Sequence, residues 1–267
     1  MSGQQQQQRQ QQQQQKWPDR LWLVRHGQSA GNVARELAEA AGHPMIDIAT
    51  RDVDVPLSPL GKRQSQALGR WFFQKLAPEE RPTVVLVSPY ERAQRTADIA
   101  LAEAGEEAGN VRLVADERLR EREFGIFDRL TKAGIEAKFP DQAALRAAIG
   151  KFYHRPPGGE SWCDVILRLR SALDTVALHY GGARVLIVGH QVVVLCLRYL
   201  VERMTEEGIL AVDAEGDVVN CGVTEYAFDP GRGVGGGLSL QRYNFAAPLE
   251  QEGASVTAEP DVSVGAR

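Results

Sequence analysis

Short apolar and β-branched runs along the chain alternate with longer segments whose apolar residues recur at helical spacing. The short runs predict strands, and their alternation with helices predicts a mostly parallel sheet covered by helices. The expected strands are Arg20–Val24, Thr83–Val87, Val111–Val114, Val185–Val188, Val223–Phe228 and Leu238–Tyr243, and the expected helices are Pro59–Leu76, Tyr90–Ala104, Ser161–Tyr180 and Val192–Met204. We therefore expect an α/β fold, a single three-layer α/β/α domain over residues 17–249.

Two stretches interrupt this alternation, at Ala34–Asp54 and Ile126–Gly159. Open α/β sheets bind ligands beyond the carboxyl ends of their strands, and both stretches follow positions that carry candidate chemistry. We therefore expect them to form a substrate-facing cover, and they are called the cover segments below.

The two ends of the chain lack the apolar periodicity of the middle. Residues 4–16 are almost entirely glutamine, so the ordering entropy of a fixed conformation has no offset there. Residues 250–267 mix small, polar and acidic residues without a period. We expect residues 1–16 to be a disordered Gln-rich tail and residues 250–267 to be a flexible C-terminal tail.

The composition is that of an ordinary globular protein, with 43% hydrophobic and 25% charged residues among 267. A formal net charge of −4 lacks the positive surplus of proteins that coat nucleic acid or anionic membranes, so we expect neither as a partner. Three widely spaced cysteines indicate no disulfide framework and favour a reducing, cytoplasmic setting. We expect no signal peptide and no membrane span.

Cationic and imidazole side chains stand where three predicted strands end. The first strand leads into Arg25, His26 and Gly27, and the second leads into a helix that carries Arg92 near its start. The strand Val185–Val188 leads into His190. Guanidinium groups and helix N-termini favour anions, so the sequence predicts an anion site at this edge of the sheet.

Three further residues near the end of the first strand could also help to bind an anion. Gly27 allows close approach of the backbone, whereas Ser29 and Asn32 offer a hydroxyl and an amide that can hydrogen-bond an anion.

The motifs at these strand ends resemble those of the histidine phosphatase superfamily, the phosphoglycerate-mutase-like group. They are an R-H-G strand end, a later S-x-x-x-R-A segment from Ser88 and a G-H strand end, in the family's order. The resemblance extends over residues 21–244 and includes Pro56–Gly61, Leu119–Gly125 and Gly158–Ser161.

The resemblance implies that His26 is the nucleophile and takes the phosphoryl group as a phosphohistidine. Arg25, Arg92 and His190 would surround the transferred group, and Asn32 would contact it. Gln191 and Glu160 are further candidates for phosphate or substrate binding. Glu160 matches the family's G-E-S segment and is expected to be a positioning residue or a helix cap. The resemblance implies no metal ion and no cofactor.

The leaving group needs a proton, and two carboxylates lie close together in this region. The family pattern places the acid four residues before a glycine, which makes Glu121 the matching acid and leaves Glu123 as its rival. We expect Glu123 to face solvent or to pair with Arg122. The run of arginines at 118, 120 and 122, together with Arg155, is expected mostly on a solvated face that draws anionic substrate.

The sequence departs from the mutases of this family at several positions. Gln28 stands where mutases commonly have Glu, Arg129 stands where a further glycine is usual, and Gln191 is followed by two valines. These departures favour a metal-independent phosphomonoesterase that acts on a small phosphorylated metabolite. The alternatives are a cofactor-dependent phosphoglycerate mutase and a catalytically silent binding domain; the sequence does not predict an oligomeric state.

Overall fold

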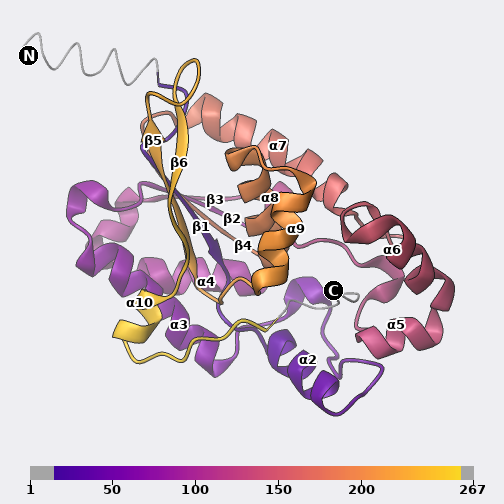
Figure 1. The fold of residues 1–267 in the computed structure, drawn as a ribbon. Coiled ribbons are helices and arrows are strands. Elements are labelled where there is room, and N and C mark those ends of the chain that lie inside the picture. Colours follow the sequence, from indigo (N-terminus) through magenta and orange to yellow (C-terminus); the bar gives the residue numbers. More distant parts are fainter. Residues whose placement is uncertain (1–14, 260–267) are drawn as a thin grey trace, which may run out of the picture.

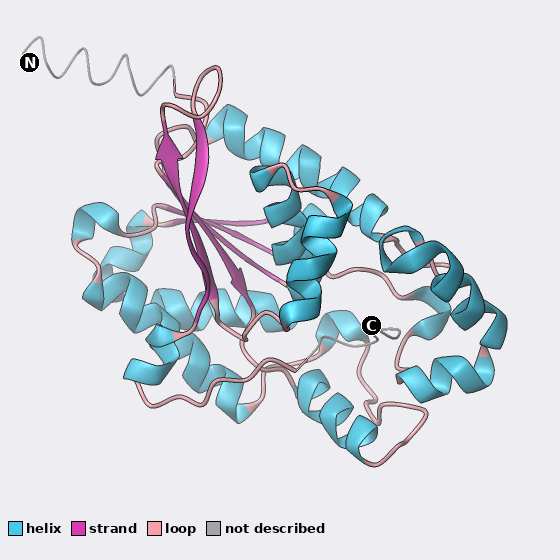
Figure 2. Cartoon of the chain, viewed as in Figure 1, coloured by secondary structure: helices cyan, strands magenta, loops and turns pink. Residues whose placement is uncertain are grey.

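The computed structural model describes residues 15–259, so the expected N-terminal tail lies almost entirely outside the described residues, as do residues 260–267. Helices lie on both sides of one central sheet (Figure 1, Figure 2). The elements are β1 (Arg20–Arg25), α2 (Ala30–Ala40), α3 (Pro59–Arg70), β2 (Val84–Val87), α4 (Glu91–Ala102), β3 (Arg112–Ala115), α5 (Lys132–Lys138), α6 (Pro140–Tyr153), α7 (Trp162–His179), β4 (Arg184–Gly189), α8 (Gln191–Glu202), α9 (Glu206–Glu215), β5 (Val223–Asp229), β6 (Gly237–Phe245) and α10 (Ala247–Gln251).

The six strands form a mixed sheet in the order β3-β2-β4-β1-β5-β6. The strands β3, β2, β4 and β1 pair in parallel, whereas β5 runs antiparallel to both β1 and β6. The expected single α/β domain with a mostly parallel sheet is confirmed. All six predicted strands are present, with ends that differ by a few residues.

Alternate side chains of the central strands enter two hydrophobic cores, one on each face of the sheet. In β1, Leu21 and Leu23 join the core beneath α7 and α8, whereas Trp22 and Val24 join the core beneath α3 and α4. The period of two in a strand therefore divides one apolar run between two layers. This arrangement fixes the strand register, because a slip of one residue would exchange the two faces.

Several helices lie where the sequence pattern predicts none. Helix α2 extends into the first cover segment; Ser29 caps its N-terminus and Asn32 completes a capping box. Helices α5 and α6 occupy the second cover segment, and α9 and α10 follow later. In contrast, the predicted helix Pro59–Leu76 ends as an α-helix at Arg70 and continues as a π-helical turn over Trp71–Lys75.

The two cover segments are joined to each other. A β-bridge pairs Met45 with Leu130, and the amide of Ile46 donates to the carbonyl of Arg129 at 2.8 Å. Arg129 has a φ of 61°, the left-handed conformation that glycine adopts most readily. A glycine, which the family resemblance led us to expect at this position, would adopt this conformation more readily.

The first part of the expected C-terminal tail is packed on the domain. Leu249 and Ala254 belong to the core beneath α3 and α4. Gln64 donates to the carbonyl of Ser255 and to the hydroxyl of Thr257, both at 2.9 Å. Residues 250–259 thus pack against the domain through isolated small apolar residues and polar pairs, contacts that no sequence period predicts.

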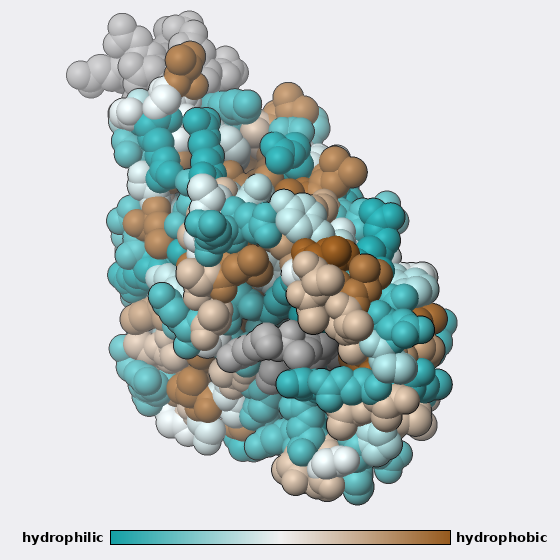
Figure 3. All heavy atoms as spheres, turned by 45° about the vertical axis from the view of Figure 1, so that its right-hand side comes forward, coloured by the Kyte–Doolittle hydropathy of each residue, from teal (hydrophilic) through white to brown (hydrophobic). Residues whose placement is uncertain are grey.

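The surface carries hydrophilic and apolar side chains interspersed with one another, as the face in Figure 3 shows. Of the helices in residues 15–259, none is both long and apolar enough to cross a lipid bilayer.

Candidate active site

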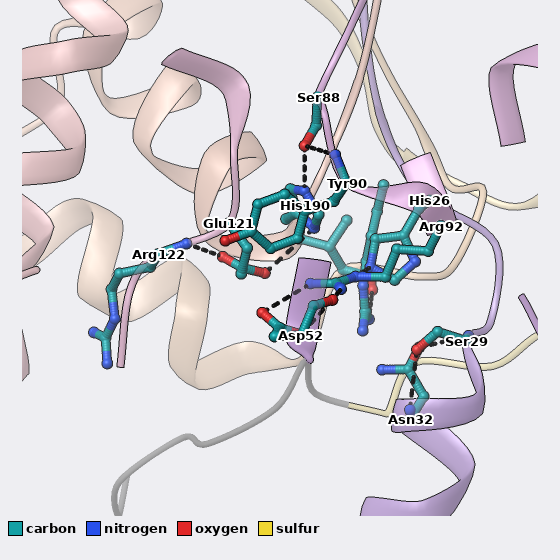
Figure 4. A network of polar contacts seen from close by, with 12 residues as sticks. His26, Ser29, Asn32, Asp52, Ser88, Tyr90, Arg92, Glu121, Arg122 and His190 are labelled. Carbon is teal, nitrogen blue, oxygen red and sulfur yellow. Dashed lines mark hydrogen bonds and ion pairs between the residues drawn. The ribbon is translucent and has the colours of Figure 1, made fainter. Parts of the chain in front are cut away.

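Parallel pairing of β1, β4 and β2 brings three strand ends to one edge of the sheet. Arg25 lies opposite Gly189, and the amide of His26 donates to the carbonyl of Gly189 at 2.9 Å. On the other side of β4, the amide of Ser88 donates to the carbonyl of Val188 at 3.0 Å. The side chains that follow these strands consequently converge (Figure 4).

The ring of His26 is completely buried and is held in one orientation. Its Nδ1 lies 2.7 Å from the carbonyl oxygen of Gly27, and Nε of Arg92 lies 3.2 Å from its Nε2. A carbonyl only accepts hydrogen bonds, so Nδ1 carries the proton and Nε2 accepts from Arg92 through its lone pair. The geometry therefore presents Nε2 of His26 as an unprotonated, nucleophilic nitrogen.

The guanidinium of Arg92 lies between the ring of His26 and a carboxylate from the first cover segment. Its Nη1 donates to Oδ1 of Asp52 at 3.0 Å and to the Asp52 carbonyl at 2.6 Å. The guanidinium carbon also lies 4.9 Å from the ring centroid of Tyr90, within the range of a cation–π contact. Burial raises the pKa of the Tyr90 hydroxyl, and the charges of Glu123, Asp52 and Glu121 raise it further. The hydroxyl of Tyr90 therefore stays protonated, and the side chain lines the site without adding a charge.

His190 faces His26, with the two ring centroids 5.2 Å apart. Nε2 of His190 lies 2.8 Å from Oγ of Ser88, and its Nδ1 lies 3.6 Å from Oε2 of Glu121. Ser88 thus fixes the ring of His190 from the sheet side, while the carboxylate of Glu121 lies on the opposite side (Figure 4).

The two rival carboxylates have different surroundings. Glu121 is completely buried and lies beside His190, whereas Glu123 is exposed and accepts a hydrogen bond from the hydroxyl of Tyr90 at 3.2 Å. The prediction that Glu123 faces solvent is confirmed. Its expected pairing with Arg122 is not observed, because Arg122 is itself buried, at 5% exposure. Arg122 therefore also departs from the expected solvated face.

Two side chains, one at the end of β1 and one in α2, donate hydrogen bonds to the same backbone carbonyl oxygen. Nη2 of Arg25 and Nδ2 of Asn32, the latter at 3.3 Å, both donate to the carbonyl of Glu259. Ser29 orients this amide, since its backbone N–H and its hydroxyl each donate to Oδ1 of Asn32 at 2.9 Å. The hydroxyl of Ser29 is thus directed to the helix cap, and Asn32 presents its amino group.

Close backbone packing holds this loop in place. A Cβ atom added to Gly61 would lie 2.0 Å from the carbonyl oxygen of Gln28, and one added to Gly27 would lie 2.5 Å from the carbonyl oxygen of Gly61. On the other side, the amide of Asn220 donates to the carbonyl of His26 at 3.0 Å. Glycine at both contact positions therefore allows the nucleophile loop to lie directly against the start of α3.

Two of the predicted site residues hydrogen-bond to groups other than those around His26. Glu160 accepts hydrogen bonds from Arg120 and Arg168 at 2.9 Å and from the amide of Glu123 at 3.1 Å. It does not cap α7, because Ser161 is the N-cap. Gln191 donates to Asp217 at 2.6 Å. Glu160 therefore positions the segment that carries Glu121, and a role of either residue in substrate binding stays a prediction.

Burial alone would raise the pKa of Glu160, but hydrogen bonds and charge from Arg168, the amide of Glu123 and the charge of Arg120 lower it overall. The carboxylate is consequently ionised and holds both arginines.

Sequence reasoning missed Asp52, Asn220 and Glu259. Asp52 lies in a cover segment and Asn220 in a loop before β5, and neither has a local signal that would connect it with His26. Ser88 was present in the S-x-x-x-R-A motif, yet its contact with His190 depends on the pairing of β2 with β4. Within residues 15–259, no group of three or more His, Cys, Asp or Glu side chains is placed to hold a metal ion.

The chain is similar to proteins of one large family. The model of the histidine phosphatase superfamily (branch 1) matches residues 21–238. A bifunctional protein of Mycobacterium tuberculosis is 31% identical over 173 residues, which is 65% of this chain but only 41% of that protein. A probable phosphoglycerate mutase of Yersinia enterocolitica is 28% identical over 180 residues, covering 67% of this chain and 72% of its own length.

Solved structures agree with this similarity. A mycobacterial glucosyl-3-phosphoglycerate phosphatase in complex with inorganic phosphate is 25% identical, with a TM-score of 0.63 over 86% of this chain and 99% of its own. An α-ribazole phosphatase of Shigella flexneri, at 20% identity, shares the fold with a TM-score of 0.66 over 85% of this chain and 96% of its own.

Proposed function

Because the chain belongs to branch 1 of the histidine phosphatase superfamily, we propose that it is a phosphomonoesterase that acts through a phosphohistidine on His26. The observation that carries the proposal is the tautomer of His26. Its Nδ1 is committed to the Gly27 carbonyl, and its Nε2 is unprotonated, so its lone pair can attack phosphorus once Arg92 turns from it to the phosphoryl oxygens. An orientation fixed before substrate arrives lowers the entropic cost of reaching the transition state.

In the first step, Nε2 of His26 attacks phosphorus while the bond between phosphorus and the leaving oxygen breaks. Arg25, Arg92 and His190 would donate to the non-bridging oxygens, where charge is concentrated, and Asn32 would add an amide donor. These groups are buried, which strengthens their interaction with an anion relative to water.

Glu121 would supply a proton to the leaving oxygen in this step. In the second step it would accept a proton from water as the water oxygen attacks phosphorus and the bond to Nε2 breaks. The location of Glu121 supports this role, since its Oε2 lies 3.6 Å from Nδ1 of His190 in a completely buried position. The substrate would be a small phosphorylated metabolite, in keeping with structures of relatives that are phosphatases.

A phosphoglycerate mutase is the second candidate, supported by the similarity to a probable phosphoglycerate mutase. It would use the same His26 but return the phosphoryl group to a second hydroxyl. The departures at Gln28 and Gln191 favour transfer to water.

The proposal is tested by phosphate release from 4-nitrophenyl phosphate in the presence of a chelator, for wild type, His26→Ala and His179→Ala. His179 is an exposed histidine on α7 and serves as the matched control. We expect release by wild type and His179→Ala but not by His26→Ala. Brief mixing with substrate should yield an acid-labile phosphopeptide that contains His26, and its absence with all substrates would overturn the covalent route.

The mutase candidate is distinguished by adding bisphosphoglycerate to a phosphoglycerate assay. Isomerisation that depends on this compound, with slow phosphate release, would favour the mutase.

A further inference from the structure

The ring of His26 is held by a carbonyl that belongs to the peptide between Gly27 and Gln28. Nδ1 of His26 lies 2.7 Å from the Gly27 carbonyl oxygen. A trans peptide is planar, and its carbonyl and its N–H point in opposite directions. The group that accepts a hydrogen bond from the Gln28 amide therefore also sets the direction of the Gly27 carbonyl.

Gln64 of α3 supplies that acceptor. Its Oε1 accepts from the amide of Gln28 at 2.8 Å, and the Gln64 side chain is completely buried. A peptide N–H only donates, so the amino group of Gln64 in the same place would bring two donors together. The hydrogen bond consequently depends on the oxygen of the Gln64 amide.

The segment after α10 fixes which end of the Gln64 amide meets Gln28. Nε2 of Gln64 donates to the carbonyl of Ser255 and to the hydroxyl of Thr257, both at 2.9 Å. A carbonyl only accepts, so an inverted amide would lose its bonds to both Ser255 and Gln28. Residues that are distant in the sequence thus orient the Gln64 side chain toward the nucleophile loop.

The peptide between His26 and Gly27 is fixed by two other buried side chains. The amide of Gly27 donates to Oγ1 of Thr96 at 3.0 Å, and the carbonyl of His26 accepts from Nδ2 of Asn220, also at 3.0 Å. Thr96 and Asn220 are both completely buried. Glycine permits wide rotation of the peptides on either side of it, so the second peptide needs its own restraint. Gln64 provides that restraint.

We infer that Gln64 is a positioning residue that keeps the proton of His26 on Nδ1, acting through the peptide between Gly27 and Gln28. When Oε1 of Gln64 accepts from the Gln28 amide, the peptide is polarised and its carbonyl becomes a stronger acceptor for the Nδ1 proton. The lone pair then stays on Nε2, the atom that attacks phosphorus. The effect on rate rests on the proposed function, whereas the tautomer is observable without substrate.

The first test replaces Gln64 by methionine, which has a similar volume and no comparable acceptor. Gln66→Met is the matched control, because Gln66 is an exposed glutamine on the same helix. Proton–nitrogen correlation spectra of protein with nitrogen-15-labelled histidine, at a pH where the ring is neutral, show which ring nitrogen is protonated. The spectrum of His26→Ala assigns the signals. We expect Nδ1 to carry the proton in wild type and Gln66→Met, and an Nε2-protonated fraction to appear in Gln64→Met.

The second test measures the consequence for catalysis with 4-nitrophenyl phosphate. Gln64→Met should lower kcat/KM about tenfold, the effect of about one hydrogen bond. The inhibition constant of inorganic phosphate should change less than about threefold, because the anion donors stay in place. Gln64→Glu is the conservative variant, since its carboxyl oxygen can still accept from the Gln28 amide. It should keep the Nδ1 tautomer and most of the kcat/KM.

The two readouts separate this inference from the proposed function. If His26 keeps its proton on Nδ1 in Gln64→Met, the inference is overturned even where activity falls, because packing then explains the loss. If the tautomer changes but wild type releases no phosphate, the positioning role stands and the proposed function fails. Where circular dichroism shows that Gln64→Met is unfolded, Gln64→Glu decides: a proton on Nδ1 supports the inference, and a proton on Nε2 overturns it.

Discussion

Asp52 and Arg92 form an ion pair at 3.0 Å, and the same guanidinium donates to the ring of His26. Arg92 is 2% exposed at its side chain and Asp52 is 21% exposed. A carboxylate from the cover thus occupies donors that the proposed mechanism assigns to the phosphoryl oxygens. In the proposed mechanism, substrate binding would require Arg92 to exchange the Asp52 carboxylate for a phosphoryl oxygen.

We predict that Asp52→Asn tightens the binding of anions at this site. Without the competing charge, the inhibition constant of inorganic phosphate should fall roughly fivefold, the equivalent of about 1 kcal/mol. Asp54→Asn is the control, since Asp54 lies two residues after Asp52 and pairs with the exposed Arg51. Weaker phosphate binding by Asp52→Asn would show instead that Asp52 holds Arg92 in its working position.

Ser88→Ala should impair the orientation of His190. The lost contact with Nε2, which measures 2.8 Å, should lower kcat about tenfold with little change in KM. Steady-state kinetics with 4-nitrophenyl phosphate measure the effect, and Ser88→Thr should recover part of the loss because it keeps the hydroxyl. An equal loss in Ser88→Thr would point to packing rather than to the hydrogen bond.

Glu121→Gln should slow the cleavage of esters with poor leaving groups far more than that of esters with good ones. Alkyl alcohols need a proton as they depart, so their kcat should fall by about 10²–10⁴, whereas nitrophenolate departs without one. Glu123→Gln, at the exposed neighbouring carboxylate, should show no such dependence on the leaving group. Equal slowing across leaving groups by Glu121→Gln would assign it a positioning role.

Gly61→Ala should disturb both folding and activity. Its Cβ would lie 2.0 Å from the Gln28 carbonyl oxygen, so the nucleophile loop must shift, at a cost of about 1–3 kcal/mol in the free energy of unfolding. Gly216→Ala is the control, because no atom lies within 4 Å of the added Cβ. Urea unfolding and turnover measure the two effects, and an unchanged variant would mean that this loop tolerates displacement.

Glu160 should make stability depend on pH. Its pKa is lowered in the folded protein, so its contribution is present above the unfolded value of about 4.3 and is lost as the pH falls through the folded value. Wild type should exceed Glu160→Gln by about 1–3 kcal/mol in the free energy of unfolding at pH 7. That difference should shrink below about pH 4 in parallel urea titrations, and a constant difference would contradict ionic bonding by Glu160.

The alternation of strands and helices predicted the sheet and the placement of His26, Arg92 and His190 at strand ends, because parallel strands direct their carboxyl ends to one edge. The contact of Asp52 with Arg92 could not be predicted from the sequence. It depends on how residues 34–54, which have no apolar periodicity, fold back over the sheet edge. Arg122 stands in a run of charged residues that is typical of a solvated face. It is nevertheless buried, at 5% exposure, which no local pattern in the run predicts.

The bridge between Met45 and Leu130 means that neither cover segment is an independent module. A Cβ on Gly134 would lie 1.9 Å from the carbonyl oxygen of Pro44. The backbone amide of Thr131 donates a hydrogen bond to the same carbonyl oxygen at 3.1 Å. Exchange of one segment for that of a relative would leave backbone groups of the other without partners. Engineered chimeras should therefore exchange residues 34–54 and 126–159 as a pair, and insertions in one are expected to require compensating changes in the other.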